Sequence, residues 1–134
     1  MGHLPAKDRP LPEGLRIQAR EGYLEAEILG RYALGRYRQQ LAGIAEACQA
    51  QKVEGLLLNW TALRGPIRTA DRYELGAEGA LILKDLKVAS LVPPALLDRR
   101  KFGQLVGRNR GLQVETFTDR EAALAWLLGP KKTS

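Results

Sequence analysis

The sequence predicts a single α/β domain built around a mixed sheet, and three observations support this prediction. The chain has 134 residues, which is enough for one hydrophobic core and short for two. Two segments near its start alternate polar and apolar residues, as half-buried strands do. Farther along, three helical patterns each stand between two strand patterns, which is typical of parallel strands joined by helical crossovers. The predicted order is ββαβαβαβα, with an N-terminal hairpin, parallel strands after it and about four helices.

The hairpin rests on a register that satisfies both faces at once. A two-residue turn at Glu21-Gly22 places Arg16 opposite Glu27 and Gln18 opposite Glu25. The other face then pairs apolar residues: Leu15 with Ile28, Ile17 with Ala26, and Ala19 with Leu24. A slip of one residue would destroy both patterns. We expect Glu25 and Glu27 on the solvent face, where exposure and charged neighbours make general acid catalysis unfavourable.

The first helix is predicted over residues 35–51. Its apolar residues fall on one stripe at helical spacing: Tyr37, Leu41, Ile44, Ala45 and Cys48. Cys48 is the only cysteine, and nothing near it in sequence supplies the setting that a reactive thiol requires. We therefore interpret Cys48 as a small buried apolar residue.

The middle of the chain predicts two buried strands around a second helix. Residues 53–59 form a continuous apolar strand of the kind that is covered on both faces. A polar loop with Gly65 and Pro66 leads to a helix over residues 69–83, followed by a strand over residues 87–92. Gly76 and Gly79 lie within that helical pattern, and we interpret them as sites of close packing on the sheet.

The last third of the chain predicts a helix, an edge strand and a short final helix. Pro93-Pro94 stops the preceding strand and sets the start of a helix over residues 95–109, which Gly111 closes in a left-handed conformation. Residues 112–117 alternate like an edge strand. The segment from Thr118 to Glu121 then resembles a capping box for a helix that ends near residue 128.

These elements define one domain over residues 15–128, a flexible arm at residues 1–14 and a tail at residues 129–134. The arm contains Pro5, Pro10 and Pro12 without a periodic apolar pattern. It also holds His3, the single histidine. Because one histidine and one cysteine cannot form a disulfide framework or a Cys/His zinc site, we expect no metal and no cofactor.

Composition restricts the class of protein further. Hydrophobic residues make up 45% and charged residues 27%, and the mean hydropathy is −0.26, which is typical of a folded, water-soluble chain. No apolar run is long enough to span a bilayer, and the start does not resemble a signal peptide. We expect a cytoplasmic protein. Phosphate-binding glycine loops, G-x-S-x-G and H-E-x-x-H are absent, so we do not expect an enzyme.

The loop after the strand at residues 53–59 is the leading candidate site. It connects the carboxyl end of a central strand to a helix N-terminus, where α/β sheets commonly bind ligands. The candidate residues are Asn59, Trp60, Thr61, Arg64, Arg68, Thr69 and Arg72. Thr69 is interpreted as the N-cap, either a simple cap or part of a site for a phosphate or carboxylate. Trp60 is either a residue at the edge of the core or an exposed anchor for a partner.

The alternative site is a basic helix face. Lysine and arginine exceed aspartate and glutamate by six, and five basic residues lie on the outward side of the third helix: Arg99, Arg100, Lys101, Arg108 and Arg110. They form either a solvated face or a site for an anion or nucleic acid. RNA-binding sheets expose spaced aromatic residues, whereas Tyr23, Trp60 and Phe117 form no such pair on one strand. Nucleic acid is therefore the second choice of partner.

Several segments resemble small bacterial STAS-domain proteins of the SpoIIAA-like type. The segments that carry this resemblance are the hairpin, the helix with Tyr37 and Leu41, and the stretches 55–59, 71–76, 109–111, 117–122 and 126–127. The resemblance covers about residues 15–128 and implies a SpoIIAA-like mixed sheet. In anti-sigma-factor antagonists of this fold, an Asp-Ser-Ser-Gly stretch at the second helix carries a phosphorylated serine. Here the stretch is Ile67-Arg68-Thr69-Ala70-Asp71, which has no serine.

The resemblance implies a regulatory, non-enzymatic interaction or ligand-sensing module. We expect it to bind a protein partner or a small ligand through residues 59–72, with an anion or nucleic-acid binder as the alternative class. A carrier of hydrophobic ligands is a third hypothesis, which requires an apolar cavity. Assembly as a homodimer is left open.

Overall fold

A computed structural model of the chain describes residues 11–97 and 101–129. The elements follow one another along the chain as β1 (Leu15–Arg20), β2 (Tyr23–Ile28), β3 (Gly30–Arg31), α1 (Leu34–Gln51), β4 (Gly55–Asn59), β5 (Leu63–Arg64), α2 (Thr69–Ile82), β6 (Lys87–Leu91), a short 3-10 helix (Pro94–Leu96), α3 (Phe102–Asn109), β7 (Gln113–Phe117) and α4 (Arg120–Leu127). His3 and the predicted tail beyond residue 129 lie outside the described residues.

The main sheet has the strand order β1-β2-β4-β6-β7. β1 pairs with β2 in antiparallel orientation, and every other neighbouring pair is parallel. The predicted hairpin register is confirmed, with Arg16 opposite Glu27 and Gln18 opposite Glu25. The strand expected at the edge, β7, ends the sheet. A second, two-stranded sheet of β3 and β5 was not predicted.

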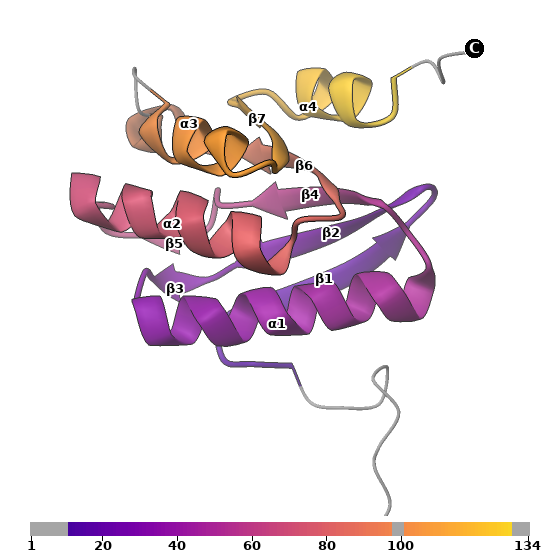
Figure 1. The fold of residues 1–134 in the computed structure, drawn as a ribbon, viewed down its shortest axis with the longest axis horizontal. Coiled ribbons are helices and arrows are strands. Elements are labelled where there is room, and N and C mark those ends of the chain that lie inside the picture. The colour runs from indigo at the N-terminus through magenta and orange to yellow at the C-terminus, as the bar shows by residue number, and fades with distance from the viewer. Residues whose placement is uncertain (1–10, 98–100, 130–134) are drawn as a thin grey trace, which may run out of the picture.

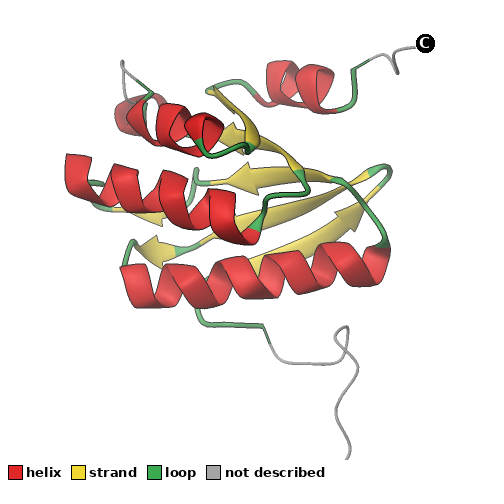
Figure 2. Ribbon diagram, viewed as in Figure 1, coloured by secondary structure: helices red, strands yellow, loops and turns green. Residues whose placement is uncertain are grey.

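Three helices lie on one face of the sheet and one on the other. The parallel strands follow each other in a single direction across the sheet, so three right-handed crossovers bring α1, α2 and α3 to the same face (Figures 1 and 2). Leu24, Leu56 and Val88 pack there in one core cluster with α1 and α2. α4 follows the last strand and packs on the opposite face, where Ala123 and Leu127 belong to a second cluster.

The helix α1 buries the predicted stripe. Tyr37, Leu41, Ile44 and Cys48 are buried, and Cys48 is 2% exposed. Burial raises the pKa of the Cys48 thiol to about 11, as expected for an unreactive core residue. Gln40 is also buried, and its Nε2 donates to the carbonyls of Glu13 and Gly14 at 3.1 and 3.0 Å, which holds these residues against α1.

The third helix is shorter than predicted. The helical turn at Pro94–Leu96 ends at Leu97, whose backbone is extended, and α3 begins only at Phe102. Lys101 has φ +47°, a left-handed conformation that redirects the chain before α3 starts. Local propensity could not show this break, because the direction of α3 depends on its packing against α2. Gly111 ends α3 at φ +94° as predicted, and the Gly111 and Leu112 amides donate to the Arg108 and Gly107 carbonyls.

Gly76 packs against a neighbouring helix, not against the sheet as we predicted. A Cβ atom on Gly76 would lie 2.3 Å from the carbonyl oxygen of Gly103 in α3, whereas one on Gly79 would lie 3.6 Å from Tyr37 Oη in α1. Three helices on one face must pack sideways against each other. The small residues therefore set the spacing between helices.

Two helix starts differ from the prediction by one residue. Arg68 occupies the N-cap position of α2, and Thr69 is the first helical residue. The Asp71 carboxylate accepts a hydrogen bond from the Arg68 amide at 3.3 Å, so Thr69 is not the cap. Asp119 caps α4 in place of Thr118 by accepting from the Ala122 amide at 2.9 Å. Aspartate and threonine are both good N-caps, and local pattern alone does not choose between adjacent ones.

Candidate functional site

The residues that follow β4 enter three different environments. Asn59 is buried on the side of the sheet that α4 covers, and its side chain contacts Glu25. Trp60 is buried in the core on the opposite side. Arg64 and Thr69 are exposed at the end of the domain. The loop that the sequence marks as one candidate site therefore contributes to three distinct structures.

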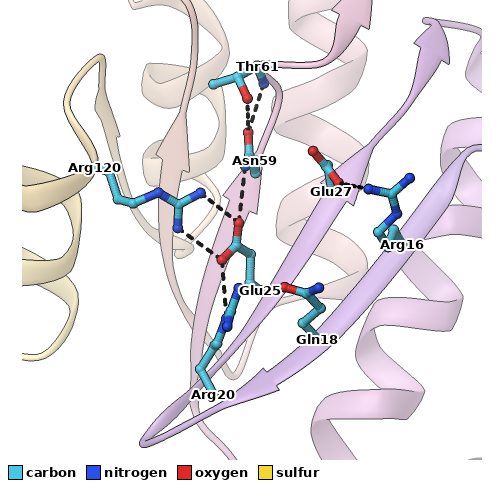
Figure 3. A network of polar contacts seen from close by, with 8 residues as sticks. All are labelled: Arg16, Gln18, Arg20, Glu25, Glu27, Asn59, Thr61 and Arg120. Carbon is cyan, nitrogen blue, oxygen red and sulfur yellow. Dashed lines mark hydrogen bonds and ion pairs between the residues drawn. The ribbon is translucent and has the colours of Figure 1, made fainter.

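The first structure is a network around Glu25, which is 6% exposed and thus not on a solvent face as we predicted (Figure 3). The two terminal nitrogens of Arg120 donate to the Glu25 carboxylate at 3.0 and 2.9 Å. Asn59 Nδ2 donates to it at 3.1 Å, and Arg20 Nε lies 3.6 Å away. The hairpin pattern could not show this burial, because Arg120 arrives from α4. Glu27 keeps its predicted pairing with Arg16, at 3.1 Å.

Glu25 is held as a carboxylate. The hydrogen bonds from Arg120 lower the pKa of Glu25 below its usual value, although burial by itself would raise it. The hydrogen bond from Asn59 also lowers this pKa. Asn59 also accepts from the amide and hydroxyl of Thr61 at 2.8 and 2.7 Å, which ties the loop after β4 to the network. A carboxylate that is bound by two arginines and an asparagine stabilises the fold, and it is poorly suited to proton transfer.

The second structure is a row of aromatic rings below the loop. Trp60 is 4% exposed, so it is a core residue and not an exposed anchor. Its ring centroid lies 5.7 Å from that of Tyr37, which lies 5.6 Å from that of Tyr32. Trp60 Nε1 donates to Ser90 Oγ at 3.0 Å, and Tyr37 Oη donates to the Leu75 carbonyl at 3.2 Å. Both polar tips are therefore satisfied inside the core.

An apolar cavity of about 100 Å³ lies beside these rings, between α2, α3 and the sheet. Most of its wall is aliphatic or aromatic, including Trp60, Ile67, Leu75, Leu83 and Val88. The cavity required by the hypothesis of a hydrophobic-ligand carrier is thus present. It also links two candidate residues that the sequence places twelve positions apart, because Trp60 and Arg72 both line it.

The hydroxyl residues Ser90 and Thr116 and three longer polar side chains, Arg72, Lys101 and Gln104, interrupt the apolar wall. Arg72 Nη1 donates to the Leu96 carbonyl at 3.1 Å. Lys101 Nζ lies 3.3 Å from the Glu115 carboxylate, and Gln104 Oε1 accepts from the Thr116 amide at 2.7 Å. Of the two cations, Lys101 is paired with a carboxylate of the domain.

The third structure is an exposed surface formed by β3, β5 and the start of α2. The parallel ladder between β3 and β5 places Arg31 directly opposite Arg64, and both side chains are exposed. Arg68 and Thr69 follow at the start of α2 and are also exposed. Within residues 11–97 and 101–129, only Arg68 of these arginines has an ion-pair partner, Asp71 at 3.7 Å.

The described residues of the predicted basic face on the third helix are all engaged within the domain. Arg108 bonds to the Glu115 carboxylate, which also pairs with Lys101, and Arg108 Nε donates to the Val114 carbonyl at 2.9 Å. Arg110 Nη2 donates to Tyr73 Oη at 2.7 Å, with its guanidinium 5.6 Å from that ring. Arg99 and Arg100 lie outside the described residues. The described members of this set therefore do not form an unpaired basic stripe.

Two solved structures share this arrangement of strands and helices. An anti-sigma factor antagonist from Mycobacterium paratuberculosis matches with a TM-score of 0.56 and 13% identity, over 85% of this chain and 92% of that chain. An uncharacterised protein of the DUF3478 family from Shewanella loihica PV-4, described as having a SpoIIAA-like fold, matches with a TM-score of 0.54 and 19% identity, over 84% of this chain and 91% of that chain. The chain has a SpoIIAA-like fold. No family model and no curated protein matches the sequence.

The SpoIIAA-like fold confirms the expectation that the resemblance to STAS domains raised. At these identities the likeness extends to the fold alone. Thr69, the hydroxyl residue of the stretch that lacks the family's serine, stands exposed as the first residue of α2. Among the described residues, no group of three or more histidine, cysteine or acidic residues is placed to hold a metal. No described helix is both long and apolar enough to cross a membrane.

Sequence reasoning missed two parts of this SpoIIAA-like domain. The partnership of Glu25 with Arg120 joins positions 95 residues apart and leaves no local pattern. The ladder of Arg31 and Arg64 consists of two residues on each strand, which is too short for alternation to show. The sequence of these strands is only Gly30-Arg31 before α1 and Leu63-Arg64 in the loop before α2. Such short pairs are not specific to a strand.

Proposed function

We propose that the protein is a non-enzymatic regulatory module that binds an acidic face of a protein partner. The binding surface is formed by Arg31, Arg64, Arg68 and Thr69, called here the Arg31–Arg64 surface. The observation that carries this proposal is the register of β3 and β5, which sets two exposed arginines side by side. The shared fold with an anti-sigma factor antagonist supports a role in regulation through protein contacts.

Like charges on adjacent strands destabilise a ladder in isolation. Among the described residues no carboxylate lies within ion-pair distance of Arg31 or Arg64, so the repulsion is not offset within the described part of the fold. Departures from local stability rules of this kind concentrate at functional sites. An acidic partner would supply the missing counter-charges, would speed association and would be sensitive to salt.

A binding role also fits the polar groups of the domain. Glu25, the most deeply buried carboxylate, is engaged by Arg120 and Asn59. The basic residues of α3 that the alternative hypothesis requires are paired with Glu115 or Tyr73 where they are described. The Arg31–Arg64 surface is therefore the set of exposed cations that we favour as the partner-binding region.

The test compares two charge reversals at opposite ends of the domain. Lys84→Glu is the matched control, because Lys84 is exposed in the turn between α2 and β6. Its substitution changes the net charge by the same amount as Arg64→Glu. Tagged wild-type protein, Arg64→Glu and Lys84→Glu are each used to capture proteins from lysate of the producing cells, with quantitative mass spectrometry. We expect a partner that wild type and Lys84→Glu retain and that Arg64→Glu binds at least about tenfold more weakly.

Two controls give the result its meaning. The captured partner should carry an acidic surface and should dissociate more readily as salt rises from low to physiological concentration. Equal capture by Arg64→Glu and wild type would refute the proposal. Loss of all capture after nuclease treatment would instead support the nucleic-acid alternative.

A further inference from the structure

We infer that the cavity between α2, α3 and the sheet binds a small monocarboxylate, with its apolar tail inside the cavity and its carboxylate on Arg72. This inference goes beyond the partner surface proposed above and does not depend on it. Arg72 lines the cavity between α2, α3 and the sheet, whereas the Arg31–Arg64 surface uses exposed groups of β3, β5 and the start of α2. The two proposals can therefore fail separately.

The size of the cavity limits the ligand. Apolar cavities of about 150 Å³ accept benzene, so a cavity of about 100 Å³ has room for an apolar group of about four or five carbons. The walls are made of residues such as Ile67, Leu75 and Val88, which offer such a group no hydrogen bonds. Burial of an aliphatic tail is the interaction that this wall favours.

The walls are held in place by tight backbone packing. The carbonyl of Gly103 approaches Gly76 so closely that a Cβ atom there would lie 2.3 Å from it. A Cβ atom on Gly103 would in turn lie 3.1 Å from the Arg72 carbonyl. The same close contact of α2 with α3 thus positions Arg72 at the cavity, and a site of this kind is largely preformed.

Arg72 supplies the recognition of charge. It is partly buried, and its described hydrogen bond is the one from Nη1 to the Leu96 carbonyl. A guanidinium has five N–H donors in a planar fork, so donors remain for the two oxygens of a carboxylate. No carboxylate among the described residues lies within ion-pair distance of Arg72, whereas the neighbouring cation Lys101 is paired with Glu115. An anion at this end of the cavity would therefore pair with Arg72.

The first experiment titrates the ¹⁵N-labelled full chain with acetate, butyrate, hexanoate, octanoate and hexanol, followed by amide chemical shifts. We expect hexanoate to shift residues of α2, α3 and β6 around the cavity. Affinity should rise by about fourfold for each methylene from butyrate to hexanoate, with no further gain for octanoate. Hexanol should bind at least about tenfold more weakly than hexanoate, because it brings no charge to Arg72.

Variants then separate the tail from the carboxylate. Arg72→Met keeps an unbranched apolar side chain and removes the charge, and we expect it to weaken hexanoate binding at least about tenfold. Arg16→Met is the matched control, since Arg16 is exposed on β1 and does not line the cavity. Val92→Phe enlarges a residue of the cavity wall and should abolish hexanoate binding without affecting the far face of the sheet.

Each of three results would overturn this inference. The first is the absence of chemical shift changes around the cavity at hexanoate concentrations up to 50 mM, which is about two orders of magnitude above a sub-millimolar Kd. The second is equal affinity of the wild type for hexanoate and hexanol. The third is an affinity of Arg72→Met for hexanoate that equals that of the wild type. A native-like amide spectrum of each variant shows that it is folded. Loss of hexanoate binding in Arg72→Met and Val92→Phe, with wild-type affinity in Arg16→Met, would support it.

Discussion

Arg120 at the start of α4 forms a two-point hydrogen bond with the carboxylate of Glu25 on β2, at 3.0 and 2.9 Å. At the other end of the helix, Lys87 Nζ donates to the Trp126 carbonyl at 2.8 Å and lies 4.5 Å from that residue's ring. α4 has only eight residues, so an isolated helix of this length would not be stable. Its two polar attachments therefore add to the apolar contacts of Ala123 and Leu127.

We predict that loss of Arg120 destabilises the domain. Arg120→Ala leaves the buried Glu25 with fewer donors, and we expect the free energy of unfolding to fall by about 1–2 kcal/mol, a value discounted for the partial exposure of Arg120. Urea unfolding of Arg120→Ala, Glu25→Gln and the double variant measures the coupling between the two residues. Arg16→Ala breaks an exposed pair with Glu27 and should cost at most about 0.5 kcal/mol. Additive effects of Arg120→Ala and Glu25→Gln would contradict the expected coupling.

The same network predicts how stability depends on pH. The pKa of Glu25 in the folded protein lies below its usual value of 4.5, mainly because of the hydrogen bonds from Arg120. The contribution of Glu25 is therefore fully present above about pH 4.5 and is lost as pH falls through the lowered pKa. The difference in unfolding free energy between wild type and Glu25→Gln should be largest at neutral pH and should shrink below pH 4.5. A difference that stays constant from pH 7 to pH 3 would refute this explanation.

Two glycines of α2 provide a matched pair for testing helix packing. Gly76→Ala places a Cβ atom 2.3 Å from a backbone oxygen of α3, so we expect a loss of about 1–3 kcal/mol. Gly79→Ala places one at 3.6 Å from Tyr37 Oη, an ordinary contact. The gain in helix propensity, up to about 1 kcal/mol, should make Gly79→Ala neutral or stabilising. Thermal unfolding followed by circular dichroism decides between them, and equal melting temperatures would contradict the packing described for Gly76.

Tyr32 and Tyr37 predict opposite effects of the same substitution. The hydroxyl of Tyr32 is buried without a hydrogen-bond partner among the described residues, and burial raises its pKa to about 12. Tyr32→Phe removes an unsatisfied polar group and should leave stability unchanged or increase it. Tyr37→Phe removes the hydrogen bond to the Leu75 carbonyl and should cost about 1 kcal/mol. A larger loss for Tyr32→Phe than for Tyr37→Phe would show that the Tyr32 hydroxyl has a partner.

Sequence pattern was most informative where local chemistry and the final fold agree. The hairpin register followed from opposite charges and apolar pairs that only one alignment satisfies, and the structure has that alignment. The stripe with Leu41 and Cys48 became the buried side of α1. The predicted start of the third helix was wrong because the true start depends on the left-handed conformation of Lys101. The sequence pattern gives no signal for that conformation.

The candidate site was predicted only in part. The loop after β4 was identified correctly as the place where a strand ends and a helix begins, but the direction of each side chain was not. Asn59 and Trp60 are neighbours in sequence, but Asn59 contacts Glu25 whereas Trp60 packs in the larger hydrophobic core. Arg72 joins Trp60 at the cavity because α2 lies across the sheet, and Arg31 joins Arg64 because β3 and β5 pair.

The sequence by itself determined the order of the strands of the main sheet and of the helices between them, the antiparallel orientation of the first strand, and the apolar side of α1. Those features follow from periodicity and from short-range pairing, which act within a few residues. Only the tertiary structure decided that Glu25 is buried under Arg120, that Arg31 faces Arg64, and that α2 and α3 enclose a cavity. Each of these depends on contacts between distant segments, whose geometry is set by how the helices crowd on one face and how α4 covers the other.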